Sequence, residues 1–160
     1  MSKLYVNEIV EANAGAGVHI PGHVIQVVTS TYATETVSGA STYTDTGLSA
    51  SITPTNASSK ILVICNFCSA GVQQTGGADA NGFFKLVRDS TDLYESIHRS
   101  YDYGNSGQIT FGSYVMSWLD SPSTTSATTY KLQQRRQAGT SVRICESNKP
   151  SVITLMEIAQ

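Results

Sequence analysis

The chain has 160 residues, of which 40% are hydrophobic and only 14% are charged, and its formal net charge is −2. One domain of this length can bury a sizeable core, but a chain without a basic excess cannot neutralise a phosphate backbone, so we expect no nucleic-acid binding. No apolar run reaches the roughly 18 residues of a membrane-spanning helix, so we expect no membrane insertion.

Hydroxyl side chains take the place of the missing charges: the chain has 21 serines and 18 threonines. Ser, Thr and Gly are mediocre or poor helix formers, and the charged residues that favour helices are scarce. The same composition suits strands and turns. We therefore expect an all-β fold.

The first 22 residues differ from the rest of the chain. Residues 4–10 and 18–20 each have the pattern of a short strand, and the glycine-rich stretch 12–17 between them is too small to pack alone. Two short strands are not stable by themselves in water, so they must lie on the main domain, on a partner protein or on copies of this chain. We predict an attachment or assembly arm over residues 1–22. Its candidate contact residues are Leu4, Val6, Ile9, Val18 and Ile20.

The remaining residues, 23–160, have the pattern of strands separated by turns, with no convincing helix. The predicted strands cover residues 24–30, 43–46, 48–52, 60–68, 83–88, 93–97, 109–120, 129–135, 141–145 and 151–158. Loops are expected at 71–80 and 100–107. This number of short strands favours a head domain that is an antiparallel β-sandwich, and a jelly roll fits the count. The expected fold is therefore a jelly-roll-like sandwich with a short N-terminal β-arm.

The most apolar stretch, residues 60–68, is nearly continuous rather than alternating. That pattern is typical of a central strand that is covered on both faces. Residues 83–88 and 93–97 are expected to pair as a hairpin. We also expect a kink at Gly112, which lies inside the long strand 109–120.

Three regions of the chain share a more specific pattern. Residues 4–26 combine two short strands, a glycine-rich turn and a Gly-His-Val-Ile-Gln opening of the head; residues 43–63 and the ending 153–158 add to it. These regions resemble tail-fibre and related virion proteins of tailed bacteriophages, especially marine ones. The heads of such proteins are similar in outline to trimeric jelly rolls of the tumour-necrosis-factor kind, so the resemblance implies a homotrimer.

The resemblance further implies a non-enzymatic structural protein on the outer surface of the virion, synthesised in the host cytoplasm. The chain has one linker of this kind and lacks the shaft repeats of long fibres. We therefore expect a short tail fibre or tip for host attachment, bound to other tail proteins and to a glycan of the host surface.

Two alternatives remain open. The first is a capsid decoration (cement) protein bound to the lattice of the major capsid protein, in which Leu4, Val6 and Ile9 would add a strand to that protein. The second, more remote, is a glycan-active or metal-dependent β-domain enzyme. It would need clustered acids or histidines that the spacing does not supply, and no serine lies in a Gly-x-Ser-x-Gly motif.

One expected loop combines tyrosines with Asp, Gly and Asn. Tyr offers a large rigid surface with a polar tip, and Asp can hydrogen-bond to sugar hydroxyls, a combination that recurs in recognition surfaces. The alternative is a loop whose tyrosines pack on their own domain. The predicted contact residues for the host or a ligand are Tyr101, Asp102, Tyr103 and Asn105.

The three cysteines suggest neither a disulfide framework nor a cofactor. Cys65 and Cys68 have the C-x-x-C spacing of redox and zinc sites, but they lie inside a predicted strand, where they would face opposite sides or straddle a bulge. A structural zinc site needs four ligands, and only Cys145 and three scattered histidines remain. We interpret the cysteines as buried thiols of a protein made in a reducing compartment, and we expect no metal or cofactor.

The histidines and turn carboxylates have a structural interpretation and a less favoured ligand-binding one. His19 and His23 flank a Pro-Gly turn, where a trimer could bring them to a metal or an anion on its axis; ordinary turn histidines are the preferred interpretation. Asp89, Asp92 and Glu95 could hold calcium, but that ion needs six to eight oxygen ligands. Solvated turn carboxylates are therefore expected.

Two adjacent arginines, Arg135 and Arg136, lie in the predicted strand 129–135 or at its end. Neighbouring residues of a strand face opposite ways, so this pair does not form a phosphate-binding patch by itself. One of them could pair with a carboxylate across a subunit contact, and a solvated hairpin end is the other interpretation.

Overall fold

The computed structural model describes residue 10 and residues 20–74, 79–100 and 108–160. Within these residues the chain forms ten strands and one short 3-10 turn. They are β1 (Val24–Tyr32), β2 (Thr36–Ser38), β3 (Thr44–Ile52), β4 (Lys60–Gln73), β5 (Ala80–Arg88), β6 (Thr91–Ser100), β7 (Ile109–Asp120), β8 (Thr128–Ala138), β9 (Ser141–Ile144), η1 (Glu146–Asn148) and β10 (Ser151–Ile158).

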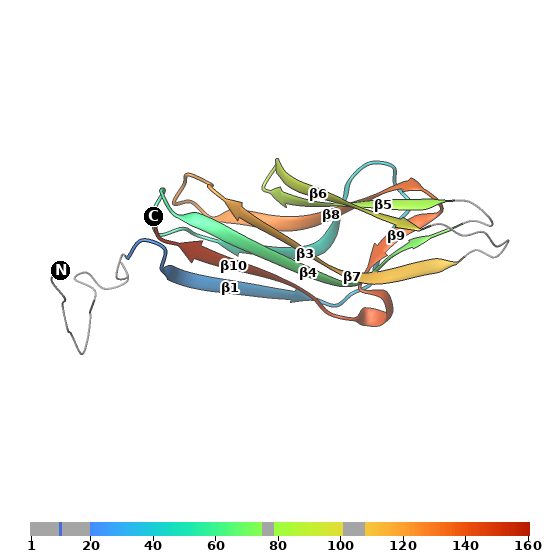
Figure 1. The fold of residues 1–160 in the computed structure, drawn as a ribbon, viewed down its shortest axis with the longest axis horizontal. Helices are drawn as coiled ribbons and strands as arrows, with labels where there is room; N and C mark the ends of the chain where they lie inside the picture. The colour runs from blue at the N-terminus through green and yellow to red at the C-terminus, as the bar shows by residue number, and fades with distance from the viewer. Residues whose placement is uncertain (1–9, 11–19, 75–78, 101–107) are drawn as a thin grey trace, which may run out of the picture.

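Two antiparallel sheets form a sandwich, and most strands run along the long axis of the molecule (Figure 1). The first sheet has the order β1-β10-β4-β7, and the short strands β9 and β2 extend it from the far end of β4. The second sheet has the order β3-β8-β5-β6. Without β2 and β9, the eight long strands have the connectivity of a jelly roll, in which two Greek keys fold onto each other. The predicted antiparallel β-sandwich is confirmed.

Alternating side chains fill the space between the sheets. Every second residue of β10 is buried, and β8 follows the same pattern over most of its length, because successive side chains of a strand point to opposite faces. The largest fully buried side chains come from both sheets and include Phe67, Phe84, Tyr130, Leu132 and Leu155. Burial of these side chains is the main favourable contribution to folding.

The strand β4 is central, as predicted, but it is not covered on both faces. It pairs with β10 and β9 along one side and with β7 along the other. Its inward residues Ile61 and Val63 are fully buried, whereas the outward residues Leu62 and Ile64 are only half-buried. The second sheet covers only the inner face of β4. The run is continuously apolar because the residues that point to the outer surface of the first sheet are apolar as well.

Several predicted boundaries are corrected by the structure. The strand β4 continues to Gln73 and β5 begins at Ala80, so the connection is shorter than the predicted loop 71–80. The irregularity expected at Gly112 lies instead in the partner strand, between Phe67 and Ala70, where Ser69 has a φ of 46°. The β5–β6 hairpin is confirmed, with a tighter turn than expected.

A buried polar cluster joins the two sheets where β7 ends. Arg88 Nη1 donates to both carboxylate oxygens of Asp120, at 2.9 and 2.7 Å, and the Tyr130 hydroxyl donates to Asp120 Oδ2 at 2.7 Å. Arg88 and Tyr130 belong to the second sheet and Asp120 to the first. A buried carboxylate is costly without such partners, and here the partners come from the opposite sheet.

The head begins beside the C-terminus of the chain. The backbone N–H of Gly22 donates to the carbonyl of Ala159 at 2.8 Å, and the N–H of Ala159 donates to the carbonyl of His23 at 2.9 Å. The start of β1 and the C-terminus therefore lie at one end of the sandwich (Figure 1). The division into an arm and a head remains a prediction, because most of residues 1–22 lies outside the described residues.

Candidate functional site

Most of the predicted contact residues lie outside the part of the chain that the structure describes. This applies to the loop candidates and to all but one of the arm candidates: Tyr101, Asp102, Tyr103, Asn105, Leu4, Val6, Ile9 and Val18. The exception is Ile20, whose side chain is exposed and whose carbonyl accepts a hydrogen bond from the His23 N–H at 2.9 Å.

Two of the three cysteines are buried, as the sequence analysis predicts, and the third is not. All three are free; Cys65 and Cys145 are buried, and Cys68 is half-buried. Burial raises the pKa of the Cys65 thiol to about 12, so it does not ionise near neutral pH. Redox chemistry at the C-x-x-C spacing therefore has no support in the structure.

The turn carboxylates are each held by a different partner. Asp89 accepts a hydrogen bond from the N–H of Thr129 at 3.0 Å, Asp92 pairs with Lys85 at 2.9 Å, and Glu95 accepts from the Tyr43 hydroxyl. Within the described residues, no three His, Cys, Asp or Glu side chains gather as metal ligands. No helix in that part of the chain is long and apolar enough to cross a membrane.

The outer face of the first sheet carries no charge over three rows that cross four strands, and seven of its twelve side chains are apolar. The register places Val27, Met156, Leu62 and Leu119 in one row across β1, β10, β4 and β7. The next two rows contain Thr29, Thr154, Ile64 and Ser117, then Thr31, Val152, Asn66 and Val115. None of these twelve side chains, which we call the apolar face, carries a charge.

Several members of the apolar face are open to solvent in the single chain. The exposed fractions are 54% for Val27, 52% for Leu119 and 64% for Val115. Several exposed apolar side chains gathered on one uncharged face are typical of a surface that contacts another protein. The edge next to it adds aromatic surface, because the rings of Trp118 on β7 and Tyr94 on β6 stack at 6.0 Å and are partly exposed.

The outer face of the second sheet has the opposite character. Two adjoining rows contain Ile97, Phe83 and Arg135, then Glu95, Lys85, Gln133 and Asp45. With Tyr43, which precedes β3, these side chains form what we call the polar face. Lys85 Nζ lies 3.8 Å from the centre of the Tyr43 ring. Burial and the hydrogen bond to Glu95 raise the pKa of Tyr43 to about 12, so the ring carries a neutral hydroxyl.

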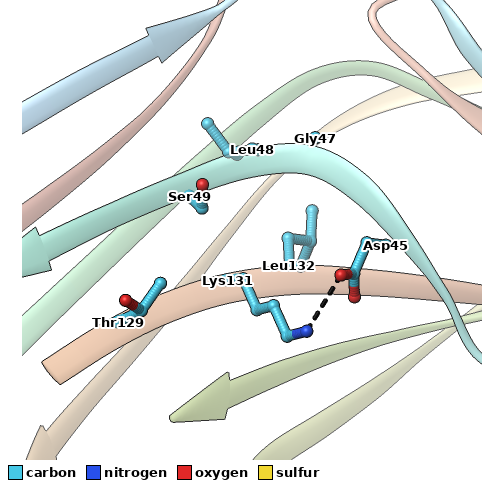
Figure 2. A pocket seen from close by; sticks show the side chains of 7 residues that line it. All are labelled: Asp45, Gly47, Leu48, Ser49, Thr129, Lys131 and Leu132. Atoms are coloured by element: carbon cyan, nitrogen blue, oxygen red, sulfur yellow. Dashed lines mark hydrogen bonds and ion pairs between the residues drawn. The ribbon is translucent and has the colours of Figure 1, made fainter. Parts of the chain in front are cut away.

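The polar face continues into a hollow of about 300 Å³ between β3 and β8. Figure 2 shows Lys131 and Asp45 joined there by an ion pair, whose atoms are 2.9 Å apart. The hollow is lined by Asp45, Gly47, Leu48, Ser49, Thr129, Lys131 and Leu132. Burial opposes ionisation of Asp45, but hydrogen bonds from Lys131 and Gln133 outweigh it and lower the pKa of this carboxyl. The hollow thus offers an ionised carboxylate and hydroxyls rather than a general acid.

A bulge in β3 creates the hollow. Asp45 pairs with Gln133 and Ser49 with Lys131, so β3 has two more residues than β8 between these points. Gly47 has a φ of +95°, and a Cβ atom there would lie 2.5 Å from the ring of Tyr32. The two strands predicted at 43–46 and 48–52 are therefore one strand with a bulge that requires glycine.

The two adjacent arginines face opposite ways, as predicted. The Arg135 guanidinium lies on the polar face, with Cζ 3.9 Å from the centre of the Phe83 ring and 5.1 Å from that of Tyr43. The Arg136 guanidinium donates to the carbonyls of Gly39 and Gly139 at 2.9 and 3.0 Å. The grouping of Tyr43, Phe83 and Arg135 leaves no local signal in the sequence, because these residues are far apart in the chain and only strand register brings them together.

Comparison with known proteins does not identify a family. No protein-family model matches the chain, and no curated protein matches its sequence. Among solved structures, it is similar to dimeric latent PorU from Porphyromonas gingivalis, with 9% identity over 93% of this chain and 14% of that chain, and a TM-score of 0.38. It is also similar to infectious bursal disease virus, Gt strain, with 15% identity over 88% of this chain and 39% of that chain, and a TM-score of 0.36. This chain spans a minor part of both, and with TM-scores below 0.5 neither similarity bears on function.

Proposed function

We propose that this chain is a non-enzymatic structural protein of the outer surface of a tailed-phage virion, and that it acts as a homotrimeric short tail fibre or tip in host attachment. The observation that carries the proposal is the apolar face on the sheet β1-β10-β4-β7. Its three rows contain no charge, and Val27, Val115 and Leu119 are open to solvent in the single chain. Covering this surface with another protein surface is favourable at about 25 cal/mol per Å².

The proposed occupant of the apolar face is a second copy of this chain. The stacked pair of Trp118 and Tyr94 forms a separate aromatic surface on the edge beside Leu119. When the apolar face of one copy covers the aromatic edge of the next, the contact is heterologous. Heterologous contacts close into rings, of which the trimer is a small example, whereas a two-fold dimer uses the same patch twice.

The placement on a virion rests on the resemblance of residues 4–26, 43–63 and 153–158 to tail-fibre-like proteins. The two faces of the sandwich fit such a role. Assembly through the apolar face leaves the polar faces directed outward in several copies. Several weak contacts to a host surface then give high avidity without a tight single site.

The location is tested by counting copies per virion with quantitative mass spectrometry, using the major capsid protein as the internal standard. A tail fibre or tip predicts a small number of copies in a multiple of three. A number comparable to that of the major capsid protein would establish the decoration alternative and overturn the tail assignment. Absence from purified particles would overturn both virion roles.

A further inference from the structure

We propose that the polar face binds an acidic saccharide, with a sugar carboxylate on Arg135 and a neighbouring sugar in the hollow between β3 and β8. This inference names a ligand class for the protein of the proposed function. It rests on that function only for the biological source of the ligand, a glycan of the host surface. The binding itself is argued from the geometry of the polar face.

Aromatic rings hold the Arg135 guanidinium in place, and no carboxylate of the described residues pairs with it. It stacks on Phe83 at 3.9 Å and lies 5.1 Å from the centre of the Tyr43 ring. The hydrogen bond between Arg135 and the Tyr43 hydroxyl uses one of the five N–H groups of the guanidinium, which leaves others for a planar, bidentate anion such as a carboxylate. The weaker hydration of Arg relative to Lys also makes this exchange of water for a ligand less costly.

Two lysines near Arg135 already have carboxylate partners. Lys85 pairs with Asp92 and Lys131 pairs with Asp45, each at 2.9 Å. Within the described residues, no ion pair involves Arg135. An incoming carboxylate therefore meets a positive charge that this part of the chain does not neutralise.

The platform around Arg135 is fixed before a ligand arrives. The Tyr43 hydroxyl donates to Glu95, so the ring that starts beside β3 reaches across the sheet to β6, with Lys85 Nζ 3.8 Å from its centre. Arg135 is thus bounded by the ring of Phe83 on β5 and by the ring of Tyr43, which precedes β3. A receptor held in this way loses little conformational entropy on binding.

The hollow lies along the same strand as Arg135. Residues of β8 that share a face are Arg135, Gln133, Lys131 and Thr129, and about 3.3 Å of rise per residue puts Lys131 about 13 Å from Arg135. A ligand that reaches both places therefore has at least two sugar rings. Asp45 and the hydroxyls of Ser49 and Thr129 are suited to sugar hydroxyls there.

The surrounding charges favour a carboxylate over a phosphate. Asp45, Asp92 and Glu95 all lie on or beside the polar face. They repel a doubly charged phosphate more strongly than a singly charged carboxylate. The net charge of −2 likewise opposes a polyphosphate such as nucleic acid.

The test titrates the full chain with digalacturonate and, in parallel, with its dimethyl ester, which has the same rings without charge. We expect a dissociation constant of about 1 mM or tighter for the acid and at least tenfold weaker binding of the ester. We expect Arg135→Gln to weaken binding of the acid at least tenfold. Lys149→Gln, which removes an exposed charge from the connection between η1 and β10, a strand of the other sheet, should leave it unchanged.

Three results would overturn the inference: equal binding of acid and ester, full affinity in Arg135→Gln, or no saturable binding of the acid at millimolar concentration. A competition with inorganic phosphate that is as effective as digalacturonate would overturn the choice of a carboxylate. Because binding is measured on the isolated protein, its outcome is independent of the copy number in particles. A virion trimer that fails to bind the acid would disprove this inference alone, and a protein that binds it but is absent from particles would disprove the proposed function alone.

Discussion

Some buried polar side chains of this sandwich form hydrogen bonds and ion pairs, which the apolar side chains of the core cannot form. Asp120 is the best example, because its carboxylate accepts hydrogen bonds from two side chains of the opposite sheet. Burial and the hydrogen bond to Asp120 raise the pKa of Tyr130. The Tyr130 phenol is therefore neutral where it donates to Asp120, and removal of the Asp120 side chain would leave Arg88 without its ion-pair partner.

We predict that Asp120→Ala lowers the free energy of unfolding by about 3–5 kcal/mol, because it leaves a half-buried guanidinium and a fully buried hydroxyl without an acceptor. Urea unfolding followed by circular dichroism measures the change. Asp92→Ala is the matched control: its carboxylate is 65% exposed in an ion pair with Lys85, and its loss should cost about 0–1 kcal/mol. Equal effects of the two substitutions would show that the Asp120 cluster does not stabilise the sandwich.

At the scale of elements, the bulge in β3 connects backbone conformation with the candidate saccharide site. Thr46 Oγ1 donates to the carbonyl of Leu132 at 2.8 Å, and Thr36 Oγ1 donates to the carbonyl of Thr46 at 2.7 Å. These hydrogen bonds hold the extra residues of β3 in place. Gly47, which is one of them, lies close to the Tyr32 ring. The hollow exists because this segment does not continue the ladder with β8.

We predict that Gly47→Ala destabilises the protein by at least about 2 kcal/mol, because it adds a clash with Tyr32 to the strain of a positive φ. Gly22→Ala is the matched control, since Gly22 also has a positive φ, +80°, but nothing lies within 4 Å of its added Cβ. The control should cost about 1 kcal/mol from backbone strain alone. Thermal unfolding of both variants separates clash from strain, and equal shifts of their midpoints would refute the role of the Tyr32 contact.

The sequence predicts most long strands because alternation of apolar and polar residues follows directly from the two faces of a sheet. The short strand β2 was not predicted, since three residues are too few to show the alternation of apolar and polar side chains. The run 60–68 was misinterpreted as buried on both faces, because an apolar outer face and a second covering layer produce the same pattern. The polar face could not be predicted, since Tyr43, Phe83 and Arg135 meet only through strand register.

The whole molecule is a sandwich with two unlike outer surfaces. The apolar face carries three uncharged rows over β1, β10, β4 and β7. The polar face carries charged and aromatic side chains over β3, β8, β5 and β6. Such asymmetry is expected when one sheet faces other copies in an assembly and the other faces solvent. It also places the proposed saccharide site on the side away from the proposed assembly contact.

The most direct test of this account is the mass of the purified full chain in solution, measured by sedimentation equilibrium. We predict a trimer for the natural sequence and a folded monomer for Val115→Asp, because that change puts a charge on the apolar face at a residue that is open to solvent in the single chain. Ser51→Asp, at an exposed residue of β3 in the other sheet, should remain a trimer. A monomer for the natural sequence at micromolar concentration, or a trimer that survives Val115→Asp unchanged, would contradict assembly through the apolar face.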